Sequence, residues 1–175
     1  MAIVTIRAMP YEAMAAFLRG DDSTQLAARL AATHDRVWII SVTNSQRCAL
    51  NAFEGWTDGP VSLVEDGEDR LALSFDDVEP QVGSRIDHER YVYFDEEMAR
   101  RVCEFVLRAH RDAPERRDLL LINCHAGVSR SGAIADFARS VTRVDYDAFR
   151  RLNPQVVPNA FVRRLLMDAW TEMPR

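Results

Sequence analysis

The chain has 175 residues, and its net charge of -5 argues against nucleic-acid binding through overall charge. All 22 basic residues are arginines, which excludes lysine-dependent Walker phosphate loops and Schiff-base chemistry. The length and a hydrophobic fraction of 47% predict one domain, residues 1–175, built around a single core.

Cysteine content and hydropathy bear on compartment and cofactors. Cys48, Cys103 and Cys124 are too few and too far apart for a disulfide framework, and none forms a C-x-x-C pair. The N-terminal stretch lacks a signal-peptide pattern, and no apolar run reaches the ~18 residues of a membrane span. We expect a cytoplasmic protein with no membrane association, no metal and no cofactor.

The first half of the chain alternates predicted strands and helices. "AIVTI" predicts a buried strand, and Tyr11–Leu18 a helix that Gly20 ends. "TQLAARLAATH" predicts another helix and "RVWIISV" another strand. After a region of turns with a short strand expected at Val61–Val64, "RLALSF" gives a strand that leads into Asp76 and Asp77.

Helices dominate the second half. From Phe94 to Ala109, apolar residues recur at helical spacing. "LLLIN" is apolar on both faces, as expected of a central strand, and "SGAIADFARSV", "YDAFRRL" and "NAFVRRLLMDAW" predict three further helices. The pattern indicates an α/β fold in which helices flank a central, mostly parallel sheet.

The segment "CHAGVSRS", residues 124–131, joins the central strand to a helix. Open α/β sheets bind ligands at the carboxyl ends of their strands, and the first N–H groups of a helix attract anions. Gly127 allows a tight loop, and Arg130 can grip two oxygens of a tetrahedral anion. The same positive surroundings favour the thiolate of Cys124, which Ser131 could stabilise by a hydrogen bond.

"CHAGVSRSGA" resembles the C-x5-R-S/T signature of the protein tyrosine phosphatase superfamily, most closely its dual-specificity form C-x-A-G-x-S-R-S. The chain is also similar to small bacterial tyrosine-phosphatase-like proteins, which share an F-x-D strand end ("FDDV") and a P-N step before the last helix ("VPNAFVRRLL"). The resemblance runs from about Arg36 to Trp170.

The resemblance implies a two-step mechanism. Cys124 attacks the phosphate ester, while Arg130 and the phosphate-binding loop stabilise the transition state. That loop comprises His125, Ala126, Gly127, Val128, Ser129 and Arg130. Ser131 would help the thiolate leave when water attacks.

A carboxylic acid must protonate the leaving oxygen. The motif-matching residue is Asp77, and Asp76 is the alternative, because one residue of register decides which side chain faces the pocket. Asp87 and Asp95 are weaker candidates.

Asn123 departs from the family pattern, in which a histidine precedes the cysteine, braces the loop and favours the thiolate. Asparagine can still hydrogen-bond loop backbone groups, but it carries no charge. We therefore expect a thiolate that forms less readily than in relatives with the histidine.

The leading hypothesis is a phosphatase acting on phosphotyrosine, or also on phosphoserine and phosphothreonine. Its partners would be a phosphorylated protein or a small phosphate ester, and phosphate, sulfate or vanadate would bind in the loop. One alternative is a phosphatase of a non-protein ester, although the loop lacks the lysines typical of phosphoinositide enzymes. The other is a pseudophosphatase that binds phosphoproteins without turnover, which Asn123 alone favours.

Overall fold

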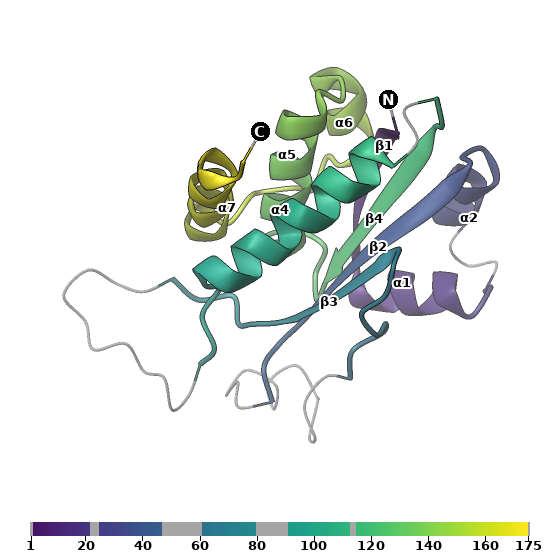
Figure 1. Cartoon of the computed structure of the whole chain (residues 1–175). Coiled ribbons are helices and arrows are strands. Elements are labelled where there is room, and N and C mark those ends of the chain that lie inside the picture. The colour runs from purple at the N-terminus through teal and green to yellow at the C-terminus, as the bar shows by residue number, and fades with distance from the viewer. Residues whose placement is uncertain (1, 22–24, 47–60, 80–90, 113–114, 175) are drawn as a thin grey trace.

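The computed structural model describes the chain apart from residues 1, 22–24, 47–60, 80–90, 113–114 and 175 (Figure 1). The strands are β1 (Ile3–Pro10), β2 (Arg36–Thr43), β3 (Arg70–Ser74) and β4 (Asp118–Cys124). The helices are α1 (Tyr11–Leu18), α2 (Gln25–Ala32), α4 (Glu96–Arg111), α5 (Arg130–Thr142), α6 (Tyr146–Leu152) and α7 (Ala160–Glu172). In the described part of the chain, no helix is both long enough and apolar enough to cross a membrane.

The four strands form one sheet in the order β1-β4-β2-β3, and every neighbouring pair is parallel. Helices α1 and α2 cover one face, and α4, α5, α6 and α7 lie on the other (Figure 1). All seven residues of β4 are buried, as expected of a central strand covered on both faces. The predicted α/β fold with a central parallel sheet is confirmed.

Most predicted elements are present, and their ends show the local causes. Gly20 follows α1 with a φ of +72°, the left-handed conformation that commonly ends a helix. Helix α4 begins at Glu96 rather than Phe94, because the Asp95 carboxylate accepts the N–H of Met98 at 2.8 Å and caps the helix.

The strand expected at Val61–Val64 is wrong. Val61 and Ser62 have no regular structure, Leu63 and Val64 form bends, and the hydroxyl of Ser62 donates to the carbonyl of Val64 at 2.6 Å. A local side-chain bond thus takes up a carbonyl that a strand would pair with its neighbour, and the valines' preference for strands does not decide the outcome.

Parallel pairing brings the carboxyl ends of the strands to one edge of the sheet. In the register, Pro10 of β1 lies opposite Cys124 of β4, and Ser41 of β2 lies opposite Asn123. The chain leaving β3 at Phe75 emerges at this same edge. Groups that are far apart in sequence therefore meet around the exit from β4.

Strand β1 is an edge strand, and its outer side is hydrogen-bonded to a side chain. The amide of the buried residue Asn153 accepts the N–H of Ala8 at 2.7 Å and donates to the carbonyl of Ile6 at 2.9 Å. It also donates to the carbonyl of Phe149 at 2.9 Å. This side chain thus bonds backbone groups of β1 that no neighbouring strand of the described chain pairs, and it ties β1 to α6.

Replacing Asn153 with leucine should lower the free energy of unfolding by about 2–4 kcal/mol, because buried backbone groups of β1 lose their hydrogen-bond partner. Urea unfolding followed by circular dichroism measures this change. Arg151→Leu, at an exposed position in α6 close to Asn153, is the control and should change the free energy by less than about 0.5 kcal/mol. Equal effects of the two substitutions would contradict the role given to Asn153.

Candidate active site

Residues 125–129 form a loop between Cys124, the last residue of β4, and Arg130, the first residue of α5. Gly127 in the middle has a φ of +72°. A Cβ atom built there would lie 2.5 Å from the carbonyl carbon of Met9 and 2.6 Å from the nitrogen of Pro10. The loop therefore packs against the end of β1 so closely that only glycine fits.

The carbonyl groups of this loop are bound from outside. Four of them accept hydrogen bonds, one from the start of α1 and three from the segment 155–159 before α7. The bonds run from Tyr11 N to His125 O (3.0 Å), from Gln155 Nε2 to Gly127 O (3.3 Å), from Val157 N to Val128 O (3.3 Å) and from Asn159 N to Ser129 O (3.2 Å). These four hydrogen bonds were not predicted from the sequence, although "NPQVVPN" has the prolines and asparagines of an ordered turn.

The N–H groups of the loop, unlike its carbonyls, are largely without hydrogen-bond partners in the described part of the chain. Among the described residues, those of residues 126–129 have no hydrogen-bond acceptor. No side chain caps α5 either, because the hydroxyl of Ser129 at its N-cap donates to Asp77 instead. Unpaired N–H groups beside a helix N-terminus form a cradle for an anion.

Arg130 supplies a full positive charge at this cradle. Its side chain is buried, Nη1 donates to the carbonyl of Phe75 at 2.7 Å, and Cζ lies 5.9 Å from the centre of the Phe75 ring. Its buried Nε has no hydrogen-bond partner in the described part of the chain. A buried guanidinium N–H without an acceptor is costly, and an anion in the loop would satisfy it.

Cys124 and Ser131 lie together at the base of the loop. Both are buried, and Sγ of Cys124 is 3.1 Å from Oγ of Ser131, within hydrogen-bond distance. Cys124 is a free cysteine. A hydroxyl at this distance can donate to a thiolate, and the N-terminus of α5 favours a negative charge at the same place.

The structure places the two aspartates after β3 in different environments. Asp77 is exposed, and its Oδ1 accepts hydrogen bonds from Ser129 Oγ at 2.9 Å and Asn159 Nδ2 at 3.0 Å, so its carboxyl group lies beside the loop. Asp76 is buried, and its oxygens accept from the N–H and hydroxyl of Ser45 and from the N–H of Val92.

Of these two aspartates, Asp77 is the one beside the loop, whereas both carboxylate oxygens of Asp76 accept hydrogen bonds from Ser45 and Val92. Asp95 is the exposed cap of α4, and Asp87 lies outside the described residues.

The hydrogen bonds expected from Asn123 to the loop backbone are absent. Asn123 is fully buried, and neither its Oδ1 nor its Nδ2 has a partner among the described residues. Side chains alternate along a strand, so Asn123 points to the sheet face opposite that of Cys124. The buried hydroxyl of Ser41, its register partner on β2, is also unpaired within the described chain. Asn123 therefore does not brace the loop as expected.

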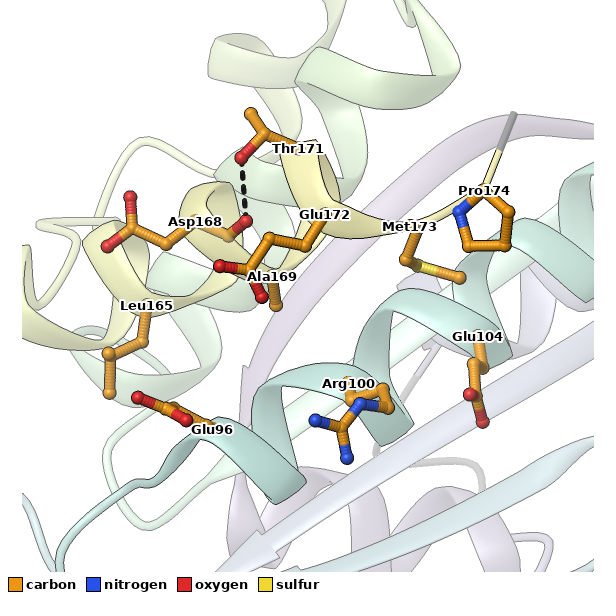
Figure 2. Close-up of a pocket in the computed structure, with 10 residues that line it drawn as sticks. All are labelled: Glu96, Arg100, Glu104, Leu165, Asp168, Ala169, Thr171, Glu172, Met173 and Pro174. Carbon is orange, nitrogen blue, oxygen red and sulfur yellow. Dashed lines mark hydrogen bonds between the residues drawn. The ribbon is translucent and has the colours of Figure 1, made fainter.

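One cleft lies away from the loop. A cleft of 610 Å³ between α4 and α7 is lined by Glu96, Glu104, Asp168 and Glu172 around one cation, Arg100 (Figure 2). Four carboxylates would repel a phosphate ester, and none of the lining residues belongs to the strand ends. Within the described residues, no three His, Cys, Asp or Glu side chains gather to hold a metal ion.

The chain is thus an α/β protein in which a cysteine, a loop with N–H groups that no described residue pairs, and an arginine lie between a parallel strand and a helix. No family model matches the sequence, and no curated protein matches it. The solved structures similar to it include Tk-PTP in the active form, at 14% identity over 99% of this chain and 94% of that chain, with a TM-score of 0.42.

They also include the human tyrosine phosphatase-like serine/threonine/tyrosine-interacting protein, at 15% identity over 83% of this chain and 82% of that chain, with a TM-score of 0.41. The first of these structures is of a PTP and the second of a tyrosine phosphatase-like protein. Because both identities and both TM-scores are low, we base the proposed function on the geometry of the site itself.

The two described cysteines should differ in reactivity. Burial, with a smaller contribution from Glu104, raises the pKa of Cys103 to about 12, so its thiol stays protonated below that pH. Iodoacetamide at pH 6–9 should therefore leave Cys103 unmodified while it alkylates Cys124, and phosphate should protect Cys124. Peptide mass mapping measures both sites. Modification of Cys103 at the rate of Cys124 would contradict this assignment.

Proposed function

We propose that this protein is a cysteine-dependent phosphatase, a dual-specificity-like member of the tyrosine phosphatase superfamily, which hydrolyses phosphate monoesters through a phosphocysteine intermediate. One observation carries the proposal: the carbonyls of loop 125–129 are bound from outside, while the N–H groups of residues 126–129 and Nε of the buried Arg130 have no acceptor among the described residues. A phosphoryl group offers three oxygens to these donors and places its phosphorus near Cys124.

In the first step, the thiolate of Cys124 attacks phosphorus, and an S–P bond forms as the P–O bond to the leaving group breaks. The electron pair of that bond stays on the leaving oxygen, which takes a proton from the carboxyl of Asp77. Arg130 and the loop N–H groups bind the equatorial oxygens, whose charge they stabilise in the transition state. The intermediate is phosphocysteine.

In the second step, water attacks the phosphocysteine. The Asp77 carboxylate accepts a proton from the water, the new P–O bond forms, and the S–P bond breaks with its electron pair on sulfur. Ser131, 3.1 Å from the sulfur, donates a hydrogen bond to the departing thiolate and makes it a better leaving group. Inorganic phosphate leaves, and Cys124 and Asp77 return to their starting states.

We propose phosphotyrosine in a protein as the preferred substrate, with phosphoserine and phosphothreonine as further substrates. The loop carries no lysine, which disfavours a multiply phosphorylated head group. We place the protein in the cytoplasm, where reducing conditions keep Cys124 a thiol. A phosphoprotein-binding module without turnover is the competing function, and the failure of Asn123 to brace the loop is the observation that favours it.

The test compares wild type, Cys124→Ser and Asp77→Asn on para-nitrophenyl phosphate, phosphotyrosine and phosphoserine peptides and a phosphoinositide. Cys124→Ser should lose activity by roughly 10³-fold or more and still bind phosphopeptide. Asp77→Asn should lose roughly 10²-fold or more on the peptides. Cys103→Ala and Asp95→Asn are the matched controls and should stay active, because neither residue lies at the loop and asparagine also caps helices.

Equal activity of wild type and Cys124→Ser would end the proposal. Inactive wild type that still binds the phosphotyrosine peptide would establish the binding module instead. A rate on the phosphoinositide above that on every peptide would move the substrate class to a non-protein ester.

A further inference from the structure

Asn159 makes three hydrogen bonds that connect α7, the loop and Asp77. Its Oδ1 accepts the N–H of Val162 at 3.0 Å and caps α7, its backbone N–H donates to Ser129 O at 3.2 Å, and its Nδ2 donates to Asp77 Oδ1 at 3.0 Å. The residue is buried, with an exposed fraction of 8%. The cap fixes the amide orientation, because Oδ1 must face Val162 and Nδ2 must therefore face Asp77.

Two donors converge on one oxygen of Asp77. The hydroxyl of Ser129 donates to the same Oδ1 at 2.9 Å. The carbonyl of Ser129 in turn accepts the backbone N–H of Asn159. No described residue hydrogen-bonds to Oδ2. Since Oδ1 accepts two hydrogen bonds, the acid proton of the neutral carboxyl group belongs on Oδ2.

We propose that Asn159 is a positioning residue for the proton donor. With Ser129, it holds Oδ1 of Asp77 against the phosphate-binding loop, so that Oδ2 carries its proton toward the leaving oxygen. The inference rests on the proposed function, because it takes Asp77 as the acid. It adds that the acid's geometry is set by a residue 82 positions away in the sequence, through a helix cap.

The cap also makes this arrangement rigid. Asn159 is fixed at the first turn of α7, and that helix packs against α4 and α5 through buried residues such as Val162 and Leu166. Asn159 therefore links both the loop and the acid to a regular element, which favours precise positioning of a reacting group.

The experiment uses two substitutions that keep the cap. Asn159→Ser retains a capping oxygen and the backbone N–H but has no donor that reaches Asp77, and Asn159→Asp retains size and cap but replaces the donor with a carboxylate. The carboxylate of Asp145 caps α6 by accepting the N–H of Ala148 at 2.8 Å. Asp145→Ser changes this cap, which lies away from Asp77, and is therefore the control.

Leaving-group dependence provides the readout, because only a poor leaving group needs the proton. On phenyl phosphate, kcat/KM, which reports the step in which the leaving group departs, should fall about tenfold in Asn159→Ser and further in Asn159→Asp. On 2,4-dinitrophenyl phosphate, kcat/KM should stay within about twofold of wild type in both. Asn159→Ser should have no added effect in an Asp77→Asn background, since both substitutions remove the same proton transfer.

The possible outcomes separate the inference from the function. An equal loss on both substrates, or an additive effect in the double variant, would reduce Asn159 to a structural brace and overturn the inference. A selective loss in Asp77→Asn without one in Asn159→Ser would overturn it while leaving the phosphatase intact. No selectivity in Asp77→Asn would place the acid elsewhere, and inactive wild type would remove both proposals.

Discussion

The site depends on the direction in which the peptide groups of loop 125–129 point. A trans peptide carries its C=O and the next N–H on opposite sides of the chain, so a carbonyl fixed toward the scaffold turns the following N–H toward the ligand side. The segment 155–159 binds three consecutive carbonyls of the loop in this way. Gly127 also packs closely against the end of β1, and this contact helps to fix the position of the loop.

This arrangement concentrates unsatisfied donors in a protein whose net charge is -5. A buried arginine nitrogen and a row of unpaired N–H groups would destabilise an ordinary core. The surrounding structure offsets that cost in two ways. The central strand of the sheet is wholly buried, and the ring and the carbonyl of Phe75 contact the guanidinium of Arg130. Donors that are already oriented need no reorganisation when charge develops on a bound phosphoryl group.

The sequence predicted the elements whose signals are local. Hydrophobic periodicity located the strands and helices, and the spacing of Cys124, Gly127 and Arg130 identified the loop. Contacts between distant segments were out of reach, because no pattern in "NPQVVPN" states which carbonyls it will bind. The expectation for Asn123 came from the resemblance, in which a histidine at this position braces the loop, whereas strand alternation directs the Asn123 side chain to the other face of the sheet.

Asp76 and Asp77 show how one residue of register divides two tasks. Asp76 accepts hydrogen bonds from Ser45 and Val92, and its own N–H donates to the Val92 carbonyl at 2.8 Å, so the chain leaving β3 is anchored on both sides. The next side chain, that of Asp77, then lies at the surface, where Asn159 and Ser129 of the loop donate hydrogen bonds to it. A buried carboxylate with every donor in place can anchor, while proton transfer requires an oxygen open to the substrate. The anchor therefore determines where the proposed acid stands.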